Sequence, residues 1–136
     1  MHIQPYLFFE GRCDEAIAFY QKAADAEVQM LMRFRDAPAE AQQNSPPANA
    51  DKVMHATLRI GQSTVMMSDG RCGGSPSFSG FALSLTVTDE AEAQRAFAAL
   101  SEGGQVGMPL AKTFFSPQFG MLTDRFGVMW MVMVEA

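Results

Sequence analysis

His55 is the residue of this chain best suited to chemistry, because an imidazole can act as a general base or bind an anion near neutral pH. It alternates with Thr57 and Arg59 in an apolar segment, and strand alternation would place all three on one face. A histidine hydrogen-bonded at the surface of a sheet is the simpler alternative, since the sequence fixes no second histidine or carboxylate beside it. Both interpretations require residues 53–60 to form a strand.

Asp69 is a second candidate polar group, because it ends the segment 64–69 directly before Gly70. A carboxylate there could hydrogen-bond a ligand at the rim of a cavity. Aspartate before glycine is also common in turns, where its side chain binds the local backbone, so a purely structural role is the alternative.

The sequence is unusually rich in methionine and phenylalanine, with eleven of each among 136 residues. Five of the methionines fall in two segments that we expect to be strands: Met66, Met67, Met129, Met131 and Met133. Flexible thioethers repack around varied shapes, so together with Tyr6 and Phe8 they suit an apolar or aromatic ligand. Ordinary filling of the core is the alternative.

The elements that must position these residues appear twice. The string Asp14-Glu15-Ala16 returns as Asp89-Glu90-Ala91, and the order of the surrounding segments repeats with it. The first copy predicts strands at 3–9, 28–34, 53–60 and 64–69 and a helix at 13–24. The second predicts strands at 81–87, 106–115, 119–123 and 128–135 and a helix at 89–101, N-capped by Thr88.

A chain of this length predicts a single domain over residues 1–136, in which two modules share one core. We expect the first module at 1–70, a linker rich in glycine, serine and proline at 71–79, and the second module at 80–136. The stretch 36–51 reads as a mobile loop that could close over a pocket as a lid.

Several classes of partner do not fit the composition. The net charge is −5 and no cluster of lysine or arginine is present, which argues against nucleic acid and anionic membranes. No apolar run is long enough to span a bilayer and no signal peptide precedes the first strand, so we expect a cytoplasmic protein. Cys13 and Cys72 then read as free thiols.

The chain resembles the PhnB-like branch of the vicinal oxygen chelate superfamily, which includes glyoxalase I, bleomycin-resistance proteins and extradiol dioxygenases. The segments that carry this resemblance span nearly the whole chain: 4–11, 16–20, 55–60, 66–69, 79–81 and 119–130. The resemblance implies an α+β fold in which two βαβββ modules form a cupped mixed sheet with helices on its outer face. It also implies a homodimer with a ligand or metal in the cup.

The superfamily's metal positions align here with Pro5, Met67, Ala82 and Met131, none of which is a ligand for a hard metal ion. A shift of register would bring in Gln4 or Ser84 without restoring four ligands. We therefore expect no metal. PhnB-like proteins are sometimes described as demethylubiquinone methyltransferases, but no strand here leads into a G-x-G-x-x-G turn, so we expect no cofactor and reject that activity.

Two hypotheses about function remain. The first is a metal-free small-molecule-binding protein whose ligand lies in the cup. The second is an enzyme of the lyase, isomerase or dioxygenase type, dependent on a metal or on His55. The candidate ligand-binding residues under the first hypothesis are Gln4, Tyr6, Phe8, His55, Thr57, Met67, Asp69, Ser84, Met129 and Met131.

Overall fold

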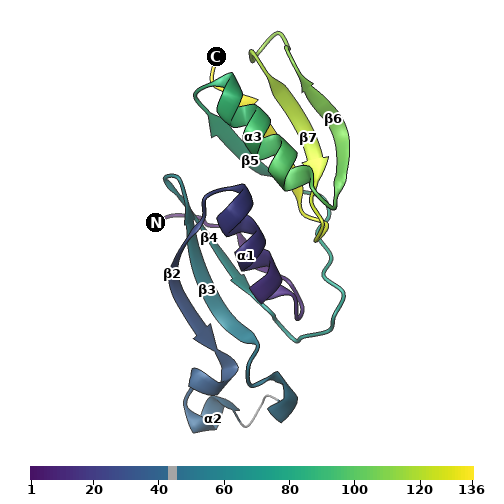
Figure 1. Ribbon diagram of the computed structural model, residues 1–136. Coiled ribbons are helices and arrows are strands. Elements are labelled where there is room, and N and C mark those ends of the chain that lie inside the picture. Colours follow the sequence, from purple (N-terminus) through teal and green to yellow (C-terminus); the bar gives the residue numbers. More distant parts are fainter. Residues whose placement is uncertain (43–45) are drawn as a thin grey trace. The chain divides into compact units, whose positions relative to one another are not determined.

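The computed structural model describes residues 1–42 and 46–136, which form two compact units, Met1–Pro76 and Ser77–Ala136 (Figure 1). The first unit contains strands β1 (Tyr6–Phe8), β2 (Glu27–Arg33), β3 (Val53–Ile60) and β4 (Ser63–Ser68) and helix α1 (Cys13–Ala23). The second contains strands β5 (Leu83–Val87), β6 (Gln105–Ala111), β7 (Phe119–Thr123) and β8 (Met129–Val134) and helix α3 (Glu90–Ser101). The predicted α+β fold with two βαβββ modules is confirmed.

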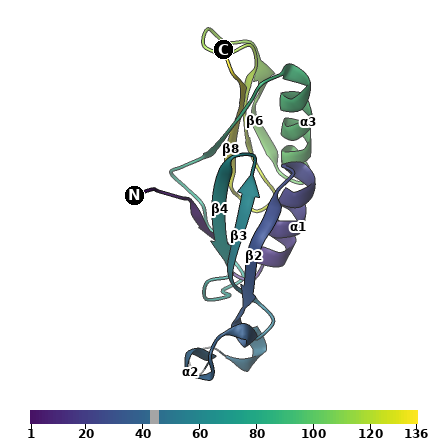
Figure 2. The same cartoon turned by 90° about the vertical axis from the view of Figure 1, so that its left-hand side faces the viewer.

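Each unit has one four-stranded mixed sheet, and the strand order is the same in both. The first sheet runs β1-β4-β3-β2 and the second β5-β8-β7-β6. In each sheet the first strand pairs in parallel with the last, and the other pairs are antiparallel. In each unit a single long helix covers one face of the sheet (Figure 2). We call the opposite face the open face of that unit.

Strand alternation separates these two faces as the sequence predicted. In β8, Trp130, Val132 and Val134 are buried, whereas the methionines that alternate with them remain partly exposed. The same pattern holds in β3, where the residues on the side of α1 are buried. Helix α1 contributes its own apolar stripe to this core: Cys13, Ala16, Ile17, Tyr20 and Ala23. Each sheet therefore has a buried apolar face beneath its helix and an open face that carries both apolar and polar side chains.

Several predicted boundaries are wrong, among them the end of β6, which lies at Ala111 rather than at residue 115, and the start of β5, which lies at Leu83 rather than at residue 81. Strand β1 begins at Tyr6 rather than at residue 3, because pairing with β4 starts at Tyr6 and Ile3 is 97% exposed. Helix α3 is capped by Asp89 rather than by Thr88. The Asp89 backbone is extended, and its carboxylate accepts a hydrogen bond from Glu92 N in the first turn at 2.7 Å.

The stretch 36–51 contains more regular structure than a loop. Short helical turns occupy Phe34–Asp36 (η1), Ala39–Gln42 (α2) and Pro47–Asn49 (η2), and Ala37 is buried. The predicted lid depends in part on residues 43–45, which lie outside the described residues. Residues 71–79, the predicted linker, contain no helix or strand. Across residues 1–42 and 46–136, no helix is long and apolar enough to cross a membrane.

Candidate functional site

The open face of the first unit brings Tyr6, His55 and Thr57 together. The Tyr6 hydroxyl lies 2.9 Å from His55 Nδ1, and His55 Nε2 lies 2.9 Å from Thr57 Oγ1. The pairing of the strands explains this proximity, because Tyr6 and Thr57 are both sheet partners of Met66 and so stand on either side of it. His55 lies two residues before Thr57 on the same face. The predicted polar residues thus form one hydrogen-bonded chain.

Both ring nitrogens of His55 are engaged in this chain. If the Tyr6 hydroxyl donates to Nδ1, then Nε2 carries the proton and donates to Thr57; the other tautomer reverses both directions. Partial burial raises the pKa of Tyr6, so its phenol stays protonated and available as a donor. In either tautomer, a substrate proton could reach His55 only after Tyr6 or Thr57 moved away. This arrangement fixes the imidazole as a polar anchor.

Aromatic rings surround the polar chain. The ring centroid of Tyr6 lies 5.0 Å from that of Phe8 and 5.5 Å from that of His55, in tilted arrangements. Phe8 is 50% exposed, so its ring is open to solvent. On the other side, Met32 is the sheet partner of His55. The face therefore combines exposed apolar surface with a few fixed hydrogen-bonding groups, as ligand sites usually do.

Asp69 does not belong to this face. It is 0% exposed, and its carboxylate accepts hydrogen bonds from the backbone N–H groups of Gly11 at 2.9 Å, Cys13 at 2.7 Å and Val53 at 2.8 Å. It thereby caps the start of α1, whose own N-cap residue Arg12 provides no capping side chain. These hydrogen bonds to the backbone explain Asp69 as a structural residue, without a role in binding a ligand.

Met67 also lies on the wrong face for the predicted site. Its sheet partners are Leu7 and Ala56, and all three are buried on the side of α1. The residue of β4 that stands on the open face is its neighbour Met66. Gln4 lies just before β1 and is half-buried.

The other predicted residues belong to the second unit. Met129 and Met131 lie on its open face, where Ser84 is the sheet partner of Met131. Ala82 precedes β5. The residues that the sequence aligned with the superfamily's metal positions, Pro5, Met67, Ala82 and Met131, carry no imidazole and no carboxylate. Among the described residues, no three His, Cys, Asp or Glu side chains gather where they could hold a metal.

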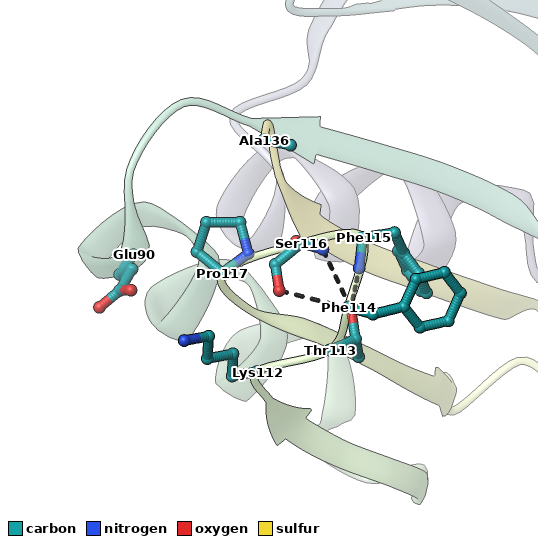
Figure 3. Close-up of a pocket in the computed structure, with 8 residues that line it drawn as sticks. All are labelled: Glu90, Lys112, Thr113, Phe114, Phe115, Ser116, Pro117 and Ala136. Atoms are coloured by element: carbon teal, nitrogen blue, oxygen red, sulfur yellow. Dashed lines mark hydrogen bonds between the residues drawn. The ribbon is translucent and has the colours of Figure 1, made fainter.

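A shallow hollow of about 440 Å³ lies in the second unit, and in the sequence only an adjacent pair of phenylalanines pointed to it. It is lined by Glu90, Lys112, Thr113, Phe114, Phe115, Ser116, Pro117 and Ala136 (Figure 3). The hydroxyl of Thr113 accepts from Ser116 N at 3.0 Å, and that of Ser116 donates to Gln118 O or Val134 O at 2.7 Å. Because these polar groups are used within the turn, the hollow offers a ligand few directed contacts.

Comparisons with known proteins identify relatives along the whole chain. The family model described as 3-demethylubiquinone-9 3-methyltransferase matches residues 1–133. Protein YjdN of Escherichia coli K12 is 39% identical over 98% of this chain and 95% of its own length.

Solved structures agree with this result. Protein PA1353 from Pseudomonas aeruginosa is 41% identical with a TM-score of 0.85, covering 99% of this chain and 98% of its own. A PhnB protein from Bacillus cereus, described as a putative 3-demethylubiquinone-9 3-methyltransferase, is 29% identical with a TM-score of 0.81, covering 98% and 99%. A glyoxylase/bleomycin resistance protein/dioxygenase domain from Frankia sp. EAN1pec, 15% identical with a TM-score of 0.64 over 99% and 95%, shares the fold.

Proposed function

This chain belongs to the PhnB-like family, described as 3-demethylubiquinone-9 3-methyltransferase, and we propose that it is a small-molecule-binding protein whose ligand site is metal-free. The ligand is apolar or aromatic and rests on the open face of the first unit. Tyr6 and Phe8 supply ring surface, and His55 with Thr57 supplies the polar anchor. Of the remaining predicted residues, Gln4 stays a proposed contact of this ligand, whereas Ser84, Met129 and Met131 belong to the second unit.

The observation that carries this proposal is the hydrogen-bonded chain from Tyr6 through His55 to Thr57 on a partly exposed face, beside the exposed ring of Phe8. A surface histidine without a binding role can hydrogen-bond to water and does not need protein partners at both ring nitrogens. Holding one imidazole at both nitrogens fixes its orientation, and a fixed polar group beside apolar surface favours binding of one ligand pose. The enzyme hypothesis is less well supported, because a general base needs a ring nitrogen that can reach the substrate.

The family's methyltransferase description does not carry over to this chain. Methyl transfer requires a donor, and a nucleotide-like donor needs a loop that cradles it. The turns that follow β1 and β5 contain no such glycine pattern. The description does suggest a ligand class, because a demethylated ubiquinone has a planar quinone ring with polar substituents, which becomes a hydroxylated aromatic ring on reduction. We therefore place hydroxylated aromatic rings first among the ligands to be tested.

The proposal is tested by screening apolar and hydroxylated aromatic metabolites for a rise in melting temperature and then measuring affinity by calorimetry. For a compound that binds, His55→Ala should weaken affinity about tenfold, because the Tyr6 and Thr57 hydroxyls lose the imidazole that orients them for the ligand. Tyr6→Phe should weaken it less, because it keeps the ring. The matched control is Thr86→Ala on the open face of the second unit, which should leave affinity unchanged. A bound compound whose affinity is untouched by both first-unit variants would refute the site.

We also propose that the protein is a cytoplasmic homodimer with one domain over residues 1–136. Its two cysteines, Cys13 and Cys72, are both unpaired, which suits a reducing compartment.

A further inference from the structure

The open face of the second unit carries a row of thioethers. Met108 of β6 is the direct sheet partner of Met121 of β7, and Met121 is the direct partner of Met131 of β8. Direct partners on neighbouring strands project their side chains from the same face of a sheet. Three methionines therefore stand side by side across three strands, although they are separated along the chain.

The row is accessible. Met108 is 46% exposed, and Met121 and Met131 are partly exposed. Met67, which serves the core, is 0% exposed by contrast. Two more thioethers flank the row, because Met129 and Met133 lie two residues to either side of Met131 on the same strand. Methionines that only filled the core would not be expected to gather on the face away from the helix.

The spacing of the row suits convergence on one ion. Neighbouring strands lie about 4.8 Å apart, so the outer two Cα atoms of the row are separated by roughly 10 Å. A methionine side chain is unbranched and flexible, so both outer side chains can lean over the central strand. Their sulfur atoms can then meet that of Met121 above β7.

The chemistry of the row selects the ion. A thioether is a soft, neutral ligand, and soft sulfur ligands select Cu(I) over harder divalent metals. Among the neighbours in the sheet, Ser84 and Thr123 are uncharged, so the row offers no carboxylate to neutralise a divalent ion. We propose that Met108, Met121 and Met131 form a binding site for Cu(I), for which Ag(I) is a redox-stable probe. This site is independent of the His55 anchor.

The first test uses protein in which the methionine methyl groups carry ¹³C, giving signals from eleven residues. Titration with Ag(I) should shift the signals of Met108, Met121 and Met131 first, while that of Met66 in the first unit stays in place. If no methionine signal moves, or if those of the first unit move equally, the site does not exist.

The second test measures Cu(I) affinity by competition with a chromogenic chelator. The background is Cys72→Ser, because the thiol of Cys72 is partly exposed and could bind the ion itself. The double variant Met121→Leu/Met131→Leu should weaken binding at least about tenfold, a loss typical of damaged metal sites. Leucine conserves volume, so the fold should survive.

The matched control is Met30→Leu/Met66→Leu, which removes two methionines from the open face of the first unit. Its affinity should equal that of the background, as should that of His55→Ala. Equal losses in both double variants would mean nonspecific thioether binding and would overturn the proposal. A change in ligand binding by His55→Ala without a change in Cu(I) affinity separates this site from the proposed function.

Discussion

Asp69 links three parts of the first unit through one carboxylate. Its two carboxylate oxygens accept hydrogen bonds from the backbone N–H groups of Gly11, Cys13 and Val53. Asp69→Ala leaves these donors without their acceptor, and we expect a loss of about 3 kcal/mol in the free energy of unfolding. Urea unfolding followed by circular dichroism measures it.

The matched control for Asp69 is Glu135→Ala. Glu135 follows β8 as Asp69 follows β4, but it is exposed. An exposed substitution of this kind should change stability by no more than about 0.5 kcal/mol. Equal changes in the free energy of unfolding for the two variants would show that the hydrogen bonds of the buried Asp69 carboxylate do not stabilise the fold.

The two cysteines differ in how far they are buried. Cys13 is 0% exposed at the start of α1, and burial followed by the nearby charge of Asp69 raises the pKa of its thiol strongly. Cys72 is partly exposed, and burial raises its pKa as well. Because the thiolate is the reactive form, we expect a disulfide reagent to modify Cys72 in the native protein and Cys13 only after unfolding. Cys72→Ser should abolish the native reaction, and a rapid reaction of both thiols would contradict the burial of Cys13.

The raised pKa of Cys13 also sets the sign of a pH effect. The unfolded thiol ionises near its ordinary value of 9.0, whereas the folded thiol does not. The stabilisation is therefore fully present below that pH and is lost as the pH rises above it, by up to about 1.4 kcal/mol per pH unit. Unfolding at about pH 8 and about pH 10 should show a smaller alkaline loss for Cys13→Ala than for the wild type. Identical slopes would refute the assignment.

At the scale of elements, helix α3 packs so closely on its sheet that β7 requires a glycine. A Cβ atom on Gly120 would lie 2.7 Å from Phe97 Cε2 and 3.0 Å from the backbone oxygen of Met108. Gly120→Ala should therefore destabilise the protein by about 2 kcal/mol through overpacking. Thermal unfolding measures it. Gly107→Ala on the adjacent strand is the control, because its Cβ would meet only ordinary contact at 3.6 Å, and an equal loss there would refute the packing argument.

The sequence predicted these elements well because alternation and helical periodicity report on burial. Strands β3 and β7 and helix α1 lie within a residue of their predicted bounds. The pattern of β4 was misleading at one point, since Met66 and Met67 are identical in type and only pairing with β1 and β3 shows which one faces the helix. The helical turns between Phe34 and Asn49 are too short to have a period.

The candidate site was predictable in part for the same reason. Tyr6, His55 and Thr57 could be assigned to one face from alternation alone, but their hydrogen bonds depend on which strands are neighbours. The row of Met108, Met121 and Met131 was missed because register shifts in β6 on both sides of Met108 hide its alternation. Asp69 appeared at the end of a strand, and nothing local showed that its partners lie near residues 11–13.

At the scale of the whole molecule, exposed apolar side chains indicate a partner. Phe114 is 101% exposed and packs only edge-on against Phe115, itself 40% exposed, at 5.1 Å between ring centroids. Exposed aromatic clusters of this kind mark interaction surfaces, and aromatic residues dominate the energy of interfaces. Together with the family resemblance, this supports the predicted homodimer, in which we expect Phe114 to be an anchor.

Sedimentation should therefore give a mass of twice 14.9 kDa for the wild type. Phe114→Asp should weaken the dimer about thirtyfold, as expected for the loss of an aromatic anchor of about 2 kcal/mol. Gln62→Asp places the same charge on an exposed position of the first unit and should leave the dimer unchanged. A mass of 14.9 kDa at every concentration would refute the dimer. A dimer that tolerates Phe114→Asp would instead place the interface elsewhere, because a buried carboxylate without a partner cannot be accommodated in an apolar contact.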